Sequence, residues 1–263
     1  MDLFLIRHGE STNNALIDNH ITFEDAMNLF LIRHGESTNN ALTDISQRVA
    51  DPELTAKGRV QAERVAAYLA EGLHLTPSER AEDRPFFDQL YSSPMIRTLH
   101  TAQAIEQAMG YRSEIWVAIH EMGGIFLDHG GGRGVVGYPG LTRAEIAARF
   151  PTSVASAEVG EDGWWDAGKE TDQQAQHRAI GVAADLRARA GENTRIGFVT
   201  HGGFMSLLLS ALGNQAMDDG SYYGHENTAI TRIELAPGTT LIRYLNRTEH
   251  LPDELQRLGH PSV

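Results

Sequence analysis

The chain has 263 residues, contains no cysteine and carries a formal net charge of −13. The absence of cysteine excludes disulfides, thiol nucleophiles and zinc-thiolate sites, and it favours a cytoplasmic protein. The negative charge argues against nucleic acids and anionic membranes as partners, and no apolar stretch is long enough to predict a signal peptide or a membrane span.

The first predicted element is a strand whose sequence occurs twice. Residues 29–42 repeat residues 3–16 letter for letter. In each copy, four apolar residues precede Arg-His-Gly and a run of small polar residues, which indicates a buried strand ending in a turn. Open α/β sheets bind ligands at such strand ends, and an arginine beside a histidine suits a phosphoryl group. The same pattern also fits a strand that merely ends in two polar residues.

Helices and strands alternate along the rest of the chain. The predicted helices span residues 55–71, 94–109, 142–150, 171–190 and 204–212, and the predicted strands span residues 86–92, 115–119, 196–200, 228–235 and 239–245. The expected N-caps of three helices are Thr55, Thr142 and Thr171. Residues 75–85 and the glycine-rich residues 123–140 are predicted to be loops. The alternation predicts an α/β fold in which helices cover both faces of a mostly parallel sheet.

Two further patterns have more than one interpretation. Residues 132–137 match the Gly-x-Gly-x-x-Gly pattern of dinucleotide-binding proteins, but Pro139 follows where the phosphate-binding helix should begin. We therefore interpret this match as accidental. The Trp164-Trp165 pair either lines a substrate cleft or anchors a loop onto the core, and the second interpretation is the more common one for such pairs.

Polar side chains follow four of the predicted strands. Arg33 and His34 end the first strand, and Arg97 lies one turn into the helix after the second. Glu121 and His201 follow the third and fourth strands. Because the carboxyl ends of parallel strands meet at one edge of a sheet, we expect these five side chains to converge there. Each has an ordinary structural explanation when it is taken alone, but a joint coincidence is improbable.

The ordered set of motifs resembles the histidine phosphatase superfamily, the phosphoglycerate mutase-like proteins. The matching motifs are Leu31-Ile32-Arg33-His34-Gly35-Glu36-Ser37-Thr38 with Asn40, Leu54-Thr55 with Gly58 and Gln61-Ala62, Ser92-Ser93-Pro94 with Arg97 and Thr101-Ala102, Glu121 with Gly123 or Gly124, and Thr200-His201-Gly202-Gly203. They extend from about residue 29 to residue 245 in the order that the family has. The resemblance implies a three-layer α/β/α sandwich.

The resemblance also implies a role for each group. His34 would attack phosphorus and become a phosphohistidine, and Glu121 would protonate the leaving alkoxide. The groups implied to contact the substrate are Arg33, Arg97 and His201 on the phosphoryl oxygens, and Asn40 and Gly202 elsewhere in the site. No metal or other cofactor is expected, and the expected partner is a small phosphorylated substrate.

Only one copy of the repeat can fill the site. His34 lies 20 residues before Leu54, close to the spacing in the resembled family, whereas His8 lies 46 residues before it. We therefore expect His34 to be the nucleophile. The chain then divides into a duplicated segment (1–26), a catalytic domain (27–248) and a tail (249–263). The spare strand would pack outside, pair with a sheet edge or exchange with the native strand, so self-association is possible and the oligomeric state stays open.

Three functions fit these residues. The leading interpretation is a phosphatase acting on a small phosphorylated metabolite. A phosphoglycerate mutase uses the same groups, but here Met122-Gly123-Gly124-Ile125-Phe126 replaces the Tyr-Gly-x-Leu-x-Gly stretch of mutases, and Asn39 stands where many relatives have tryptophan. A non-catalytic module that binds phosphorylated ligands is disfavoured because no catalytic group is missing. Specificity is expected from residues 123–140, the tryptophan pair and the pair Tyr222-Tyr223, which do not define a ligand.

Overall fold

The computed structural model describes residue 23, residues 25–217 and residues 220–256. The first copy of the repeat, with the strand that was expected to pair or exchange, lies outside the described residues, as does the end of the predicted tail. None of the helices in the described part of the chain has the length and apolar character that crossing a membrane requires.

A six-stranded sheet forms the centre of the molecule, in the order β3-β2-β6-β1-β7-β8. The strands are β1 (Met27–Arg33), β2 (Gln89–Ser92), β3 (Glu114–Ile115), β6 (Arg195–Thr200), β7 (Ile230–Ala236) and β8 (Thr239–Arg247). The pairs β3-β2, β2-β6 and β6-β1 are parallel, whereas β7 pairs antiparallel with β1 and β8. The predicted mostly parallel sheet of an α/β fold is therefore confirmed.

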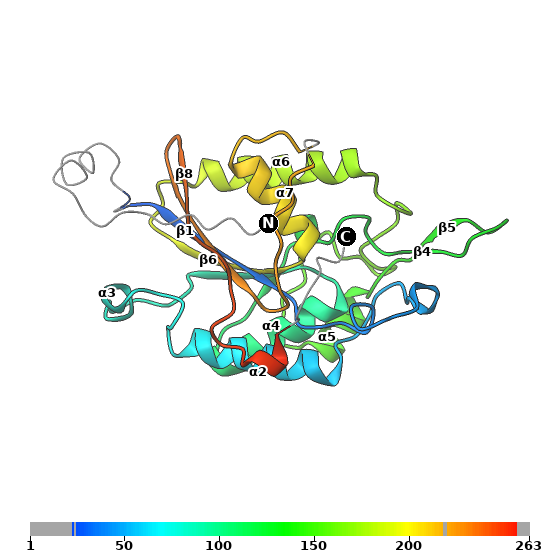
Figure 1. Ribbon diagram of the computed structural model, residues 1–263, viewed down its shortest axis with the longest axis horizontal. Helices are drawn as coiled ribbons and strands as arrows, with labels where there is room; N and C mark the ends of the chain where they lie inside the picture. Colours follow the sequence, from blue (N-terminus) through cyan, green and yellow to red (C-terminus); the bar gives the residue numbers. More distant parts are fainter. Residues whose placement is uncertain (1–22, 24, 218–219, 257–263) are drawn as a thin grey trace.

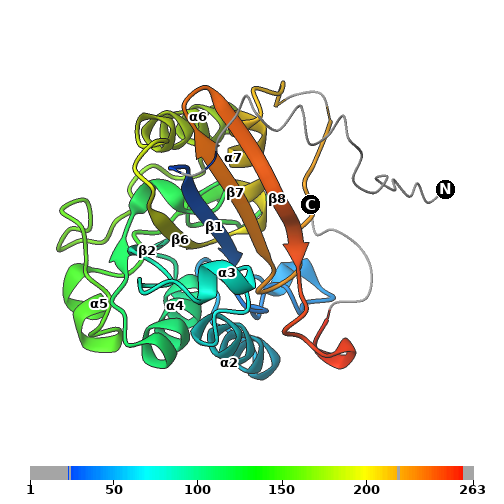
Figure 2. The same cartoon turned by 90° about the vertical axis from the view of Figure 1, so that its left-hand side faces the viewer.

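Helices cover both faces of this sheet (Figure 1). The helices are α2 (Ala56–Ala70), α3 (Pro77–Arg80), α4 (Ile96–Met109), α5 (Arg143–Arg149), α6 (Asp172–Ala188) and α7 (Gly202–Leu212). Figure 2 shows α6 and α7 on one face, and α2 and α4 on the other. Because side chains alternate along a strand, Leu29 and Leu31 of β1 pack with α6 and α7, while Phe30 and Ile32 pack with α2 and α4.

The predicted helix starts are confirmed at three threonines. The Thr55 hydroxyl accepts a hydrogen bond from the Gly58 N–H at 2.9 Å. Thr142 and Thr171 each begin a helix with a reciprocal capping box. The predicted loop at 75–85 is wrong in part, because Thr76 and Glu79 form the same capping box at the start of α3. This helix has a single turn and no apolar face, so the periodic pattern that marks longer helices was missing.

Several predicted boundaries also need correction. The second strand begins at Gln89, because the Phe86 N–H donates to the Tyr111 hydroxyl at 3.1 Å and not to a neighbouring strand. The strand predicted at 115–119 is wrong beyond Ile115. A 3₁₀ turn (η2, Val117–Ile119) follows there and redirects the chain just before Glu121. Two further 3₁₀ segments of the same length are η1 (Ile45–Gln47) and η3 (Asp253–Leu255).

The glycine-rich segment predicted as a loop contains a small hairpin. Its strands are β4 (Phe126–Asp128) and β5 (Val135–Gly137), and the hairpin projects from the body in Figure 1. The segment with the dinucleotide-like pattern therefore ends in a strand and not in a phosphate-binding helix. Trp164 is buried with Ile146 and Phe150, which supports the interpretation of the tryptophan pair as a loop anchor.

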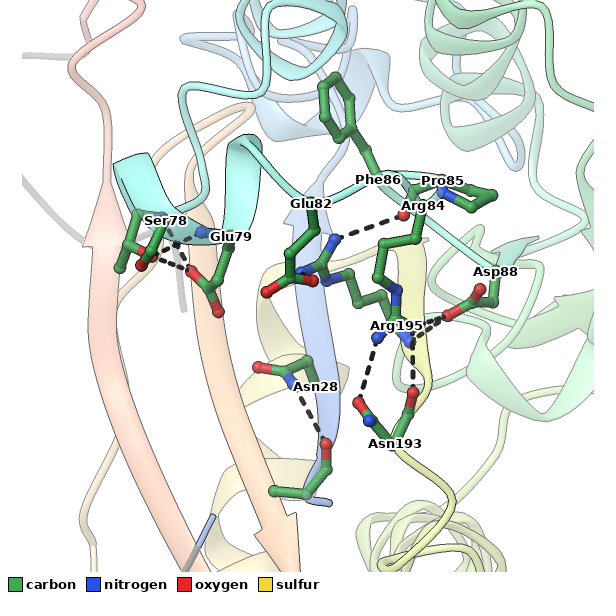
Figure 3. A network of polar contacts seen from close by, with 12 residues as sticks. Asn28, Ser78, Glu79, Glu82, Arg84, Pro85, Phe86, Asp88, Asn193 and Arg195 are labelled. Atoms are coloured by element: carbon green, nitrogen blue, oxygen red, sulfur yellow. Dashed lines mark hydrogen bonds and ion pairs between the residues drawn. The ribbon is translucent and has the colours of Figure 1, made fainter. Parts of the chain in front are cut away.

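A network of ion pairs closes the edge of the sheet where β1 and β6 begin (Figure 3). The buried Arg195 guanidinium pairs with Glu82 at 2.6 Å, and the backbone N–H of Arg195 donates to a carboxylate oxygen of Asp88 at 2.8 Å. Arg84 bridges Asp88 and Asn193 at 2.7 and 3.1 Å. These contacts tie residues 82–88 to the start of β6. The amino edge of the sheet is thus occupied by structural contacts, whereas the opposite edge carries the catalytic candidates.

Candidate active site

The candidate site lies at the carboxyl edge of β1, β6 and β2, which are neighbours in the sheet. Arg33 is the last residue of β1 and His34 follows it, while His201 directly follows β6. Parallel pairing of β1 with β6 places Arg33 opposite Thr200, so the two histidines lie side by side. Their ring centroids are 5.2 Å apart. The predicted convergence at one sheet edge is observed for this pair.

His34 is held in one orientation. Its Nδ1 lies 2.7 Å from the Gly35 carbonyl oxygen, which can only accept, so Nδ1 carries the proton. The other nitrogen, Nε2, accepts a hydrogen bond from Nε of Arg97 at 3.2 Å. The lone pair of His34 therefore points at a guanidinium. A glycine is required at position 35, because a Cβ there would lie 2.4 Å from the Gly58 carbonyl oxygen.

The loop before β7 fixes the backbone of the candidate nucleophile. The carbonyl oxygen of His34 accepts hydrogen bonds from Nδ2 of Asn227 at 3.1 Å and from the Thr228 N–H at 3.3 Å. On the other side, the His34 N–H donates to the Thr200 carbonyl at 3.0 Å. The His34 backbone is thus bound to β6 on one side and to the loop before β7 on the other, so it has little freedom to shift.

The charges around His34 favour its neutral form. Burial lowers the pKa of His34 well below its usual value, and the positive charges of Arg97 and Arg33 lower it further. The pKa of His201 is lowered in the same direction, first by burial and then by Arg97 and His34. A phosphoryl dianion bound between these groups would oppose both shifts. The protein environment therefore favours two neutral imidazoles beside two guanidiniums, which suits an anionic ligand.

The two arginines come from different elements and are both buried. Nη1 of Arg33 donates to the carbonyl oxygen of His225 in the loop before β7. Arg97 lies in the first turn of α4, where its Nη1 is 3.6 Å from a carboxylate oxygen of Asp51. Gly202 lies against Arg33, since a Cβ at that glycine would be 3.4 Å from Nε of Arg33.

Glu121 reaches the same site from beyond η2. Its Oε1 accepts a hydrogen bond from the Phe204 N–H at 3.0 Å, at the start of α7. His201 is the N-cap of that helix, so the carboxylate and the second imidazole are held by the same helix end. The charge of Glu121 acts on Arg97, whose pKa burial lowers and Asp51 and Glu121 raise. The five side chains expected to meet are therefore brought to one sheet edge.

Asn40 lies at the rim of this site. Its Oδ1 accepts from the Ser37 N–H at 3.1 Å and lies 3.5 Å from Nδ2 of Asn227. These contacts order the turn after His34. The oxygen of Asn40 is therefore engaged within the protein.

Two residues at the site were not identified from sequence. Asp51 supports Arg97, and both of its carboxylate oxygens lie 3.2 Å from the Ile96 N–H. Asn227 supports His34 from 193 residues away. Asp51 is one of two acids in the loop between η1 and α2, and Asn227 stands in a polar stretch typical of turns. No local pattern distinguishes either residue, because their contacts arise only from long-range packing.

The chemistry of the site follows from these positions. A neutral imidazole offers Nε2 as a nucleophile beside two cations, which can hold the oxygens of a phosphoryl group during in-line attack. The carboxylate of Glu121 lies at the start of α7, beside the helix end that carries His201. This set of groups can transfer a phosphoryl group to nitrogen and supply a proton to the departing oxygen.

Solved structures of similar fold include several phosphatases. A phosphoserine phosphatase from Entamoeba histolytica with phosphoserine bound is 25% identical, covers 86% of this chain and 100% of its own, and has a TM-score of 0.54. YhfR of Bacillus stearothermophilus is 23% identical, with coverages of 86% and 99% and a TM-score of 0.54. A mycobacterial glucosyl-3-phosphoglycerate phosphatase is 20% identical, with coverages of 84% and 99% and a TM-score of 0.50.

The sequence comparisons differ in outcome. A search of curated protein sequences gives no match to the chain. A family model described as the histidine phosphatase superfamily (branch 1) matches residues 29–248, which include all five converging side chains. With this match over most of its length, the chain belongs to the histidine phosphatase superfamily.

Proposed function

We propose that the chain is a phosphomonoesterase that hydrolyses a small phosphorylated metabolite through a phosphohistidine on Nε2 of His34. The observation that carries the proposal is the 3.2 Å contact between Nε2 of His34 and Nε of Arg97, beside the neutral ring of His201. This contact lies where a phosphoryl group would bind. The membership in a phosphatase superfamily and the phosphatases of similar fold support the same chemistry.

Two steps account for the hydrolysis. First, Nε2 of His34 attacks phosphorus, the bond from phosphorus to the ester oxygen breaks, and the protonated Glu121 gives its proton to the leaving alkoxide. Second, water attacks the phosphohistidine, the Glu121 carboxylate takes a proton from it, and the nitrogen–phosphorus bond breaks to release inorganic phosphate. Arg33, Arg97 and His201 would hold the equatorial oxygens in both steps.

A trapping experiment tests this function. The purified chain is mixed with a panel of phosphorylated metabolites, and released phosphate is measured. With a substrate labelled in its phosphoryl group, an alkaline denaturing quench preserves a phosphohistidine and should recover label on His34. Movement of the label to another position of a phosphoglycerate, without phosphate release, would indicate a mutase. Binding without any label on the protein would indicate a non-catalytic module.

Replacement of Arg97 by alanine should lower kcat/KM for p-nitrophenyl phosphate by at least about 10²-fold, because a preorganised charge at the transition state is lost. Arg149→Ala is the matched control, since this arginine pairs with Glu53 at 2.7 Å and its side chain is 39% exposed. The control should retain its activity. An Arg97→Ala variant that is folded and unimpaired would exclude Arg97 from the phosphoryl site.

Replacement of Asp51 by asparagine should lower kcat/KM about tenfold at pH values above 6, which corresponds to ~1.4 kcal/mol for the loss of one charged partner of Arg97. Burial raises the pKa of Asp51 to about 6, against the opposing charge of Arg97. Below that pH the wild-type carboxyl is itself neutral. The ratio of wild-type to variant activity should therefore fall toward one as the pH decreases, and a constant ratio would contradict this role.

A further inference from the structure

The first turn of α7 holds the side chain of Glu121 through backbone N–H groups. Oε1 of Glu121 accepts a hydrogen bond from the Phe204 N–H at 3.0 Å and another from its neighbour, Met122 N–H, at 2.9 Å. The Gly203 N–H approaches Oε2 at 3.4 Å. A helix N-terminus favours a carboxylate there, since its first N–H groups lack partners within the helix.

The helix can approach Glu121 this closely because residue 203 has no side chain. A Cβ at Gly203 would lie 2.6 Å from Oε1 of Glu121 and 3.1 Å from Sδ of Met122. Contacts from a Cβ below 3.0 Å essentially do not occur, so one of the groups would have to move. The backbone of Gly203 is helical, and its φ angle is compatible with an L-residue. The glycine is therefore not required for the backbone conformation of α7.

We propose that Gly203 is a positioning residue for Glu121, and that its missing side chain lets α7 hold Oε1 while Oε2 carries the transferred proton. The inference rests on the proposed function, in which Glu121 is the acid. Oε1 already accepts hydrogen bonds from the Met122 and Phe204 N–H groups. A proton bound to Oε1 would therefore be repelled by these two N–H hydrogens. Within the described part of the chain, Oε2 has only the longer contact with the Gly203 N–H, and it is the oxygen left to donate.

Leaving-group dependence separates this role from a general structural one. An alkyl phosphate releases a strongly basic alkoxide that needs a proton, whereas p-nitrophenyl phosphate releases a stable phenolate that does not. We expect Gly203→Ala to lower kcat/KM for an alkyl phosphate substrate by about 10- to 100-fold, within the range of general acid catalysis. The value for p-nitrophenyl phosphate should change less than about threefold, because His34 and the arginines stay in place.

Stability and a matched glycine provide the controls. Alanine favours a helix interior more than glycine does, so Gly203→Ala should not lower the unfolding midpoint through the backbone. Gly181→Ala in α6 is the matched variant, since a Cβ there meets no atom within 4 Å. It should leave both substrates unaffected. Glu121→Gln should reproduce the selective loss with alkyl phosphates.

A second variant tests the steric cause directly. Glu121→Asp shortens the acid by one methylene and withdraws the carboxylate from position 203. When it is combined with Gly203→Ala, the loss should be smaller than the product of the two single losses, because the clash is already relieved.

The outcomes distinguish this inference from the proposed function. An unfolded Gly203→Ala variant, an equal loss with both substrates or undiminished turnover of the alkyl phosphate would overturn the positioning role. A wild-type chain that releases phosphate from neither substrate would instead remove the proposed function itself.

Discussion

Replacing His34 by alanine is expected to lower phosphate release by at least about 10⁴-fold, because the nitrogen that forms the covalent intermediate is removed. Replacing His8 by alanine should leave the activity unchanged. The reason is positional: the backbone of His34 is bound by Thr200, Asn227 and Thr228, and its Nε2 faces Arg97. Both variants replace a histidine by alanine in the same local sequence, because residues 3–16 and 29–42 are identical. Each variant therefore serves as the control for the other.

The opposite result would have a specific meaning. Residues 3–16 and 29–42 are identical, so every side chain that β1 presents to the site also exists in the first copy. Retained activity in His34→Ala would mean that the first copy can replace β1 in the sheet. The double variant His8→Ala/His34→Ala would then be inactive. Recovery of the phosphohistidine label on a peptide that contains His8 rather than position 34 would identify the exchanged copy.

Mild acid is expected to destabilise the fold strongly, through histidines that favour the neutral form. Burial lowers the pKa of His34 and His201 well below 6.5, that of His74 to about 3, and those of His225 and His250 to about 4. In the unfolded chain each ring binds a proton near pH 6.5. The stability from these neutral rings is therefore complete above pH 6.5 and is lost as the pH falls below it.

The expected size of this effect is large. Each such histidine costs up to ~1.4 kcal/mol per pH unit below 6.5, and domains are stable by only about 5–15 kcal/mol. The unfolding free energy should thus decrease steeply between about pH 6.5 and about pH 5, as measured by urea denaturation. Asp51, with its raised pKa of about 6, works in the opposite direction and offsets part of the loss. Glu79 and Glu170, with lowered pKa values of about 2, add to the loss only at lower pH.

His74 offers a matched control for the acid effect. Its ring packs against Phe30, Phe86 and Phe87, and among the described residues neither ring nitrogen has a hydrogen-bond partner. His74→Phe should therefore be tolerated at neutral pH. The His74→Phe variant should lose unfolding free energy less steeply with falling pH, by up to ~1.4 kcal/mol per pH unit. An unfolding free energy that stays constant down to pH 5 would show that these rings are protonated in the folded chain.

Local signals in the sequence determine most of the fold, and long-range contacts determine the rest. The capped helix starts at Thr55, Thr142 and Thr171 were predictable, because each cap and its helix lie within a few residues. The turn that replaces the end of the strand predicted at 115–119 was not, since the Thr200 hydroxyl binds the Ile119 carbonyl from 81 residues away. The alternation of predicted strands with predicted helices was sufficient to predict a mostly parallel sheet with helices on both faces.

The candidate site divides in the same way. Its five converging side chains were predictable because each follows a strand in the expected order. Their supporting residues were not, since the pairing of Asp51 with Arg97 depends on how a loop folds across the start of α4. The sequence shows that residue 203 is a glycine, but it does not show that a Cβ there would lie 2.6 Å from Oε1 of Glu121.

The start of α7 has a consequence for how such a site can diversify. One rigid body bears both the ring that would grip the phosphoryl oxygens and the anchor of the proton donor. A lateral shift of α7 would displace His201 and the anchor of Glu121 together. Repacking α7 against α6 therefore cannot change the position of one group without moving the other. Adaptation to new leaving groups would then fall to the peripheral segments, such as the β4–β5 hairpin, which can change in length without disturbing the chemistry beneath.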